Sequence, residues 1–234
     1  MAILPWSAVM FQWLAMGVAF TFSLRKFVEN PAQLTLILSL PYLLSLGIGP
    51  VANFMSDRIW TRIGRRKPLI LVSWCGTITF ITLMPLMPNV WALMAVYILF
   101  SAFNDLGAGA METLKQEIVP PKQRGASTAA ATWLSTLANL TFNFVAIGRF
   151  DDYRFLAGWP VSGEQAIYWS LAAALLIMLM VILLGVKELD PQSRVRGERF
   201  SFRKFFGSIF SANLWPVFLL IFGSAMAGSG LGVM

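Results

Sequence analysis

The sequence predicts an all-α protein that crosses a membrane several times. Hydrophobic residues make up 57% of the 234 residues and charged residues 12%, against roughly 45–50% and about 25% in soluble domains. The apolar residues lie in blocks long enough to cross a hydrocarbon layer of about 30 Å, which takes about 20 helical residues. Most cations lie in the short connections between these blocks. A polytopic helical membrane protein is the class that fits all three observations.

Each apolar block predicts one transmembrane helix, because a backbone exposed to lipid can pair its amide groups only within a helix or a closed barrel. The first block is expected to remain as a helix, since Met1–Trp6 contains no cation of the kind that opens a signal peptide. The predicted spans are Ser7–Leu24, Gln33–Met55, Pro68–Met87, Trp91–Leu114, Ser127–Gly148, Ile167–Lys187 and Asn213–Gly232.

These spans divide the chain into three expected parts. Residues 1–188 are expected to form a six-helix bundle, residues 189–212 an amphipathic linker on the cytoplasmic surface of the membrane, and residues 213–234 the first helix of a second bundle. The rest of that second bundle is expected to be missing from the chain, because a seventh helix alone has no partners with which to complete a bundle.

The distribution of cations predicts the orientation of the helices. The connections after the second, fourth and sixth spans hold most of the 18 Lys and Arg residues, and cationic connections stay on the cytoplasmic side. The amino terminus of this integral membrane protein is therefore expected in the cytoplasm. Arg25 and Lys26 are an exception, because they follow the first span on the outer side.

The composition speaks against several partners and chemistries. The formal net charge of +7 arises largely in loops beside the membrane, where topology and anionic headgroups account for it, so we expect the lipid bilayer and no nucleic acid as a partner. The chain has no His, and Cys75 is its single Cys, so we expect no metal site and no intrachain disulfide. We also expect no cofactor and no enzyme activity, because the sequence shows no nucleophile–base pair and no phosphate-binding loop.

Asp105 is the most informative polar residue inside a predicted span. A carboxylate near the centre of a bilayer costs about 2.5–3.5 kcal/mol on insertion scales, so it is expected to face a cavity or a partner, where it can bind and release a proton. Its alternatives are a structural hydrogen bond and a pairing with a cation in the missing half of the protein. A polar stripe on one helical face is made by Ser101, Asp105, Ala108 and Glu112. Lys115 predicts a local ion pair for Glu112.

The fifth span carries a second face of small and polar residues. Such a face suits close helix packing at one end and contact with hydroxyl groups at the other. It consists, at four-residue intervals, of Ser127, Ala131, Ser135, Asn139 and Asn143.

The connection between the second and third spans carries the strongest family signal. Gly49-Pro50, Ser56-Asp57-Arg58 and Gly64-Arg65-Arg66-Lys67-Pro68 resemble the loop between helices two and three of the major facilitator superfamily. Five residues separate the Asp-Arg pair from Gly64, where superfamily members usually have a single residue. This longer form is similar to the branch of sucrose transporters and glycoside–pentoside–hexuronide cation symporters. The segment Ile118-Val119-Pro120-Pro121-Lys122-Gln123-Arg124-Gly125 resembles the second cytoplasmic signature of the superfamily.

The resemblance implies a cytoplasmic gate of charged residues that closes the inner side and opens when two bundles rock apart. Glu117 is the expected partner of Arg62 or Arg65, because a planar guanidinium can hold a carboxylate at two points. Arg124 is the expected partner of Asp57. The expected gate residues are Asp57, Arg58, Arg62, Gly64, Arg65, Arg66, Glu117 and Arg124.

Two features of this loop qualify the expected gate. The alternative for Arg66 and Lys67 is that they only fix the topology of the helices. Asn53 stands where the family usually has glycine, four residues before the loop aspartate, so tight closure at that point is not expected.

The resemblance also implies secondary active transport of a small hydrophilic solute, a sugar or a glycoside, by alternating access. A proton is the expected coupling ion because it needs one titratable group, such as Asp105, whereas sodium needs a cage of oxygen ligands. The alternative is a truncated, transport-inactive remnant or a membrane interaction module, which the DNA downstream of Met234 would distinguish. The residues expected to contact the solute or the coupling ion are Gln12, Ser101, Asn104, Asp105, Glu112, Asn139 and Asn143.

Overall fold

The computed structural model describes Gln12, residues 16–56, Thr61, Gly64 and residues 66–146, 153–156 and 159–186. The chain divides into two units, Met1–Arg194 and Val195–Met234, and all of these residues belong to the first. The predicted linker and seventh span therefore lie outside the described residues.

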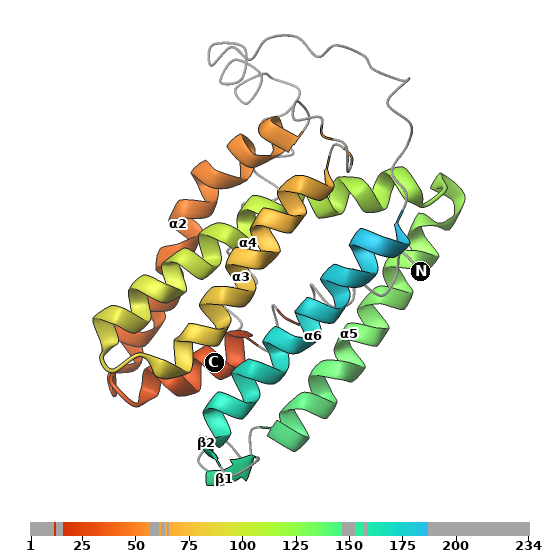
Figure 1. Cartoon of the computed structure of the whole chain (residues 1–234). Coiled ribbons are helices and arrows are strands. Elements are labelled where there is room, and N and C mark those ends of the chain that lie inside the picture. Colours follow the sequence, from red (N-terminus) through yellow and green to blue (C-terminus); the bar gives the residue numbers. More distant parts are fainter. Residues whose placement is uncertain are drawn as a thin grey trace. The chain divides into compact units, whose positions relative to one another are not determined.

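The described part of the chain is helical along almost its whole length (Figure 1), which confirms the predicted all-α fold class. Gln12 and residues 16–25 are helical, in keeping with the first predicted span. The remaining α-helices are α2 (Pro31–Ser56), α3 (Lys67–Leu83), α4 (Val90–Ile118), α5 (Arg124–Ala146) and α6 (Gly163–Gly185). Short 3₁₀ helices η1 (Met84–Leu86) and η2 (Pro121–Gln123) follow α3 and precede α5.

Local chemistry sets the helix ends where they differ from the predicted spans. Pro85 has no N–H for a helical hydrogen bond, so α3 ends at Leu83 and continues as η1. Asn89 caps α4 by accepting a hydrogen bond from the Ala92 amide at 2.8 Å. Ser162 and Gln165 form a capping box, which starts α6 four residues before the predicted span.

A β-hairpin between α5 and α6 was not predicted. Strands β1 (Tyr153–Leu156) and β2 (Trp159–Ser162) pair antiparallel, with Tyr153 opposite Ser162 and Leu156 opposite Trp159. The register leaves residues 157–158 to connect the strands. In the sequence, a β-hairpin was indicated only by the aromatic and β-branched residues on both sides of this short connection.

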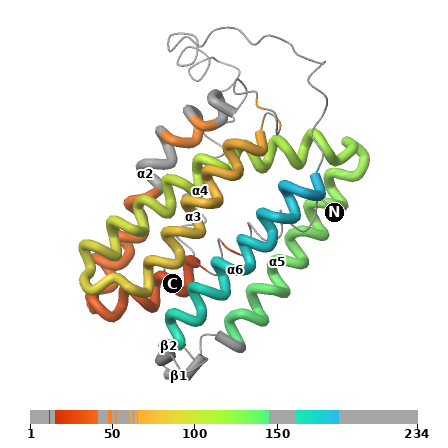
Figure 2. The backbone as a smooth tube through the Cα atoms, viewed as in Figure 1, coloured from red at the N-terminus to blue at the C-terminus, as the bar shows by residue number. Residues whose placement is uncertain are grey.

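The α3 and α4 helices form the centre of the packing of α2, α3, α4 and α6. The α4 helix contacts both α2 and α3, and α3 also contacts α6, as the smooth trace in Figure 2 lets the reader follow. The helix of residues 16–25 meets α4 where the Phe20 ring stacks on the Tyr97 ring, with centroids 3.7 Å apart. Helices in lipid associate through such close packing rather than through the hydrophobic effect.

The contact between α3 and α4 is especially close. A Cβ atom on Gly107 of α4 would lie 2.2 Å from the Ser73 hydroxyl oxygen of α3. A Cβ atom on Gly76 of α3 would lie 2.1 Å from the ring of Phe103 on α4. The Ser73 hydroxyl donates a hydrogen bond to the Phe103 carbonyl at 2.6 Å. Small residues thus let the two backbones approach, as is typical of helices in membranes.

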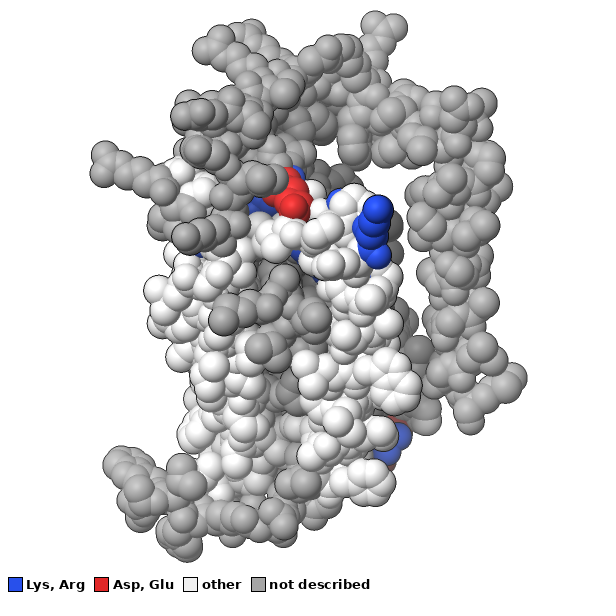
Figure 3. Space-filling model, turned by 90° about the vertical axis from the view of Figure 1, so that its right-hand side faces the viewer, with Lys and Arg blue, Asp and Glu red and all other residues white. Residues whose placement is uncertain are grey.

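Three stretches within the described residues are long and apolar enough to cross a membrane, namely α3 with η1, α4 and α6. Figure 3 shows one face of the molecule, on which the visible Lys, Arg, Asp and Glu side chains lie near the ends of the helices and not around their middle. The α5 helix is long enough but is not among the three. Its Asn139 and Asn143 lower its hydropathy, which a helix with a buried polar face tolerates.

Candidate functional site

The predicted polar stripe lies on the side of α4 that is turned away from α3. Phe103 and Gly107 touch α3, and Asp105 lies two positions from each, which is about 200° around the helix. Asp105 is half-buried and sits near the middle of α4. Ser101 is half-buried on the same face. Asp105 therefore lies on a different face of α4 from the one that packs on α3.

A side-chain contact joins the first helix to α4 beside this carboxylate. The Gln12 amide nitrogen donates to the Asn104 side-chain oxygen at 3.4 Å, and Gln12 is only 2% exposed. Asn104 immediately precedes Asp105. The structure thus brings together two of the predicted site residues, Gln12 and Asn104, which are 92 positions apart in the sequence.

At one end of the bundle, Arg66 is paired with Glu117. The Arg66 Nε and Nη2 atoms both donate to Glu117 Oε1, at 3.1 and 2.8 Å, and the Arg66 side chain is 5% exposed. This pair joins the start of α3 to the end of α4. Glu117 was expected to bind Arg62 or Arg65, which lie outside the described residues, as do Asp57 and Arg58.

Two more cations at this end bind backbone carbonyls. The Lys67 ammonium donates to the Leu183 carbonyl at 3.1 Å, which joins α3 to the last turn of α6. The Arg124 guanidinium donates to the Gln116 carbonyl at 2.7 Å and to the Val119 carbonyl at 3.3 Å. Cations are favourable at these carbonyl-rich helix ends. Buried contacts give Arg66 and Lys67 a structural role in addition to any effect on topology.

Gly64 closes a tight turn in the preceding loop. Its amide donates to the Thr61 carbonyl at 3.2 Å, and the Thr61 amide donates to the Gly64 carbonyl at 3.0 Å. Gly64 has a φ of 132°, a conformation that other residues adopt only with strain. This backbone requirement accounts for glycine at the position.

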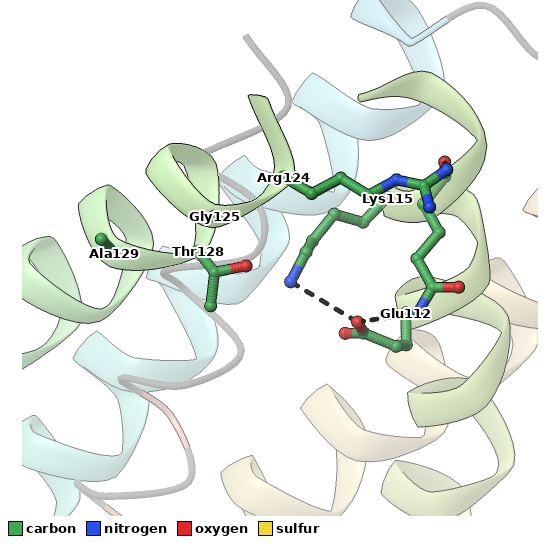
Figure 4. Close-up of a pocket in the computed structure, with 7 residues that line it drawn as sticks. Glu112, Lys115, Arg124, Gly125, Thr128 and Ala129 are labelled. Atoms are coloured by element: carbon green, nitrogen blue, oxygen red, sulfur yellow. Dashed lines mark hydrogen bonds and ion pairs between the residues drawn. The ribbon is translucent and has the colours of Figure 1, made fainter. Parts of the chain in front are cut away.

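An open pocket of about 660 Å³ lies between the end of α4 and the start of α5 (Figure 4). Glu112 and Lys115 form the predicted local ion pair there, with Oε1 and Nζ 3.5 Å apart. Gln116 donates to the same carboxylate oxygen at 3.3 Å. The Glu112 side chain, 39% exposed, places the end of the α4 polar stripe in this pocket. The lining residues are Glu112, Lys115, Gln116, Arg124, Gly125, Thr128 and Ala129.

The predicted small and polar face of α5 is its inward face. Ser127, Ala131 and Ser135 are buried, whereas Trp133 and Phe144 on other faces are 79% and 86% exposed. Polar residues inside and apolar residues outside are the arrangement expected of a helix bordered by lipid. Asn139 and Asn143 continue the inward face and are partly buried.

A polar cluster at the other end of α6 was missed in the sequence. Glu164 accepts hydrogen bonds from Ser23 at 2.6 Å and from Lys26 at 2.6 Å. The Tyr168 hydroxyl lies 2.8 Å from the Ser23 hydroxyl. Because Ser23 has one proton, which it gives to Glu164, we assign Tyr168 as the donor to Ser23.

This cluster pairs one of the two cations that conflicted with the predicted orientation. Lys26 follows the first span, on the side expected to be outside, and its ion pair with Glu164 neutralises its charge. The signal in the sequence was a Lys at one helix end and a Glu at another. Their separation of 138 positions left no local spacing that could have joined them.

Among the described residues no group of three or more Cys, Asp or Glu side chains is arranged to hold a metal ion.

Comparison with known proteins gives one match. No curated protein matches the chain. A family model for the Major Facilitator Superfamily matches residues 2–234.

Proposed function

The chain belongs to the major facilitator superfamily, a family of membrane transporters rather than enzymes, and from this premise we propose that it carries a small hydrophilic solute across the membrane together with a proton. The solute is a sugar or a glycoside, and the bundle alternates between openings on the two sides of the membrane. The longer form of the loop around Gly64, similar to that of the sugar-transporting branch, supports this choice of solute.

The position of Asp105 is the observation that carries the proposed coupling. Asp105 is half-buried near the middle of a helix that is long and apolar enough to span the bilayer. Its face of α4 is turned away from α3 and ends at Glu112 in the open pocket. A titratable group near the middle of a membrane-spanning helix, on a face that leads to an open pocket, is well situated to take up and release a proton.

The contacts of Arg66 and Lys67 support a rigid bundle. The end of the bundle at which these cations lie is called the basic end here, and the proposed gate lies next to it. Arg66 ties α3 to α4, and Lys67 ties α3 to α6, so these helices move as one body. In this proposal the basic end is cytoplasmic, and Asp57, Arg62 and Arg65 close the inner side against the other moving part of the protein.

Sugar uptake into liposomes tests the proposed coupling. Full-length protein is reconstituted, and accumulation of radiolabelled sucrose, glucose and xylose is measured with and without an inwardly directed proton gradient. The gradient should drive accumulation of at least one sugar several-fold above the external concentration, and replacing sodium by potassium should change nothing. Asp105→Asn should abolish accumulation while sugar exchange across the membrane at equal pH persists, because an amide cannot carry the proton.

Glu29→Gln is the matched control, because Glu29 is an exposed carboxylate outside the helices. It should leave accumulation unchanged. Sugar uptake that responds neither to the gradient nor to Asp105→Asn would remove the coupling proposal, and a requirement for sodium would replace the proton as the coupling ion.

A further inference from the structure

Two neighbouring amides on the inward face of α5 leave part of their hydrogen-bonding capacity unused. Asn143 Nδ2 donates to Asn139 Oδ1 at 2.8 Å. The remaining two groups of these amides, Asn139 Nδ2 and Asn143 Oδ1, are buried and have no hydrogen-bond partner. Rotating both side-chain amide groups by 180° would make Asn139 the donor and Asn143 the acceptor. Either way, a single bond between them leaves one N–H donor group and one carbonyl oxygen unpaired.

Such a pair requires an explanation, because buried polar groups are nearly always hydrogen-bonded. Lipid cannot supply the partner, since hydrocarbon has no hydrogen-bonding groups. The amides also lie on the inward side of α5, in line with the buried Ser127, Ala131 and Ser135. A partner that approaches from the inner side of α5 would satisfy both groups.

We propose that the Asn139–Asn143 pair binds the hydroxyl groups of a neutral polyhydroxylated solute, an inference that rests on the proposed transport function. A hydroxyl group can accept a hydrogen bond from the free N–H group, and it or its neighbour on the sugar ring can donate one to the free carbonyl oxygen. The two free groups then find both partners on one molecule.

The same chemistry selects against charged solutes. A carboxylate or phosphate only accepts hydrogen bonds and would leave the amide oxygen unpaired, while an ammonium group only donates and would leave the N–H group unpaired. A site built to bond a hydroxyl group strongly rejects an analogue that lacks it, because the protein groups are then buried without partners. The pair is thus a specificity site for the arrangement of hydroxyl groups on the solute.

The test uses full-length protein in liposomes and the sugar, among sucrose, glucose and xylose, that the wild type transports best. Asn139→Leu and Asn143→Leu keep the approximate side-chain shape and remove the amides. Each should raise the half-saturating concentration of the sugar roughly tenfold, with sugar-driven proton movement per sugar unchanged. Thr141→Val is the matched control, because Thr141 is exposed between the two asparagines and its hydroxyl donates to the Leu137 backbone carbonyl. It should leave that concentration unchanged.

Deoxy analogues separate direct binding from a structural effect. Each analogue of the transported sugar lacks one hydroxyl group, and one of them should bind the wild type roughly tenfold more weakly than the parent sugar. Asn139→Leu and Asn143→Leu should bind the parent and that analogue equally.

If the leucine variants transport the sugar as the wild type does, the role of the pair is overturned and the transport proposal stands. Variants that lower thermal stability and still discriminate the analogue would show that water or another helix pairs the amides. A wild type that transports none of the three sugars would overturn both proposals.

Discussion

At the scale of single residues, ion pairs join helices at both ends of the bundle, and Asp105 lies near the middle of α4. Arg66 and Glu117 join α3 to α4 at one end, and Lys26 and Glu164 join the first helix to α6 at the other. Short-range pairs such as Glu112–Lys115 follow from helical spacing and were predicted from the sequence. The Lys26–Glu164 pair was not, because it depends on which helix ends meet in space.

Replacing Arg66 tests the first of these pairs. Arg66→Ala should lower the free energy of unfolding by about 1–3 kcal/mol, because it removes two charge-assisted hydrogen bonds from a buried guanidinium. Arg66→Lys should restore only part of the loss, since an ammonium group lacks the planar fork. Thermal unfolding in detergent measures both, with exposed Arg25→Ala as the control that should change little. Equal stability of Arg66→Lys and the wild type would argue against the two-point contact.

A double-mutant cycle tests the second pair. Lys26→Met and Glu164→Gln should each destabilise the protein, and the double variant should be less destabilised than the sum, with a coupling on the order of 1 kcal/mol. The coupling is expected to be modest because Lys26 is 44% exposed at its side chain. Additive effects would mean that the ion pair contributes nothing measurable and that the hydrogen bond from Ser23 is sufficient to hold Glu164.

At the scale of the elements, hydropathy and helix signals predicted where the helices lie, and local chemistry decided where they end. Each predicted span within the described residues contains a helix, and differences of up to one turn arise from Pro85 and from the Ser162 capping box. The hairpin was missed because an apolar pattern sought for helices does not register two strands of four residues. Which helices pack together was not predictable either, because it depends on small residues that meet across interfaces.

The approach of α3 and α4 gives a prediction at this scale. Gly107→Ala should destabilise the protein by about 1–3 kcal/mol, because the new methyl group would overlap Ser73 and force the helices apart. Adding Ser73→Gly should recover part of the loss by removing the atoms it meets. Gly17→Ala is the control, since a Cβ atom there meets nothing within 4 Å. Thermal unfolding of all four proteins checks the idea, and a Gly107→Ala variant as stable as the wild type would contradict it.

At the scale of the whole molecule, the sequence predicted the class and the position of the central carboxylate, while contacts between distant residues had to come from the structure. The family match and the apolar helices agree with the composition. The face of α4 that carries Asp105 and the inward face of α5 both followed from spacing alone. The Gln12–Asn104 contact and the unpaired groups of the Asn139–Asn143 pair did not, because they require atomic positions.

Cysteine labelling tests the proposed orientation. In a Cys75→Ser background, Thr61→Cys should react with a membrane-impermeant thiol reagent only after the cells are opened, because the basic loop is expected in the cytoplasm. Glu29→Cys, in the exposed connection before α2, should react in intact cells. The opposite pattern would invert the protein in the membrane and with it the assignment of the gate.

The most direct test of the whole account is proton movement driven by sugar. Liposomes containing full-length protein and a trapped pH-sensitive dye receive the transported sugar outside, at equal pH on both sides. The lumen should acidify as the sugar enters, and Asp105→Asn should admit sugar without acidification. Sugar entry with no acidification in the wild type, or with equal acidification in Asp105→Asn, would contradict it.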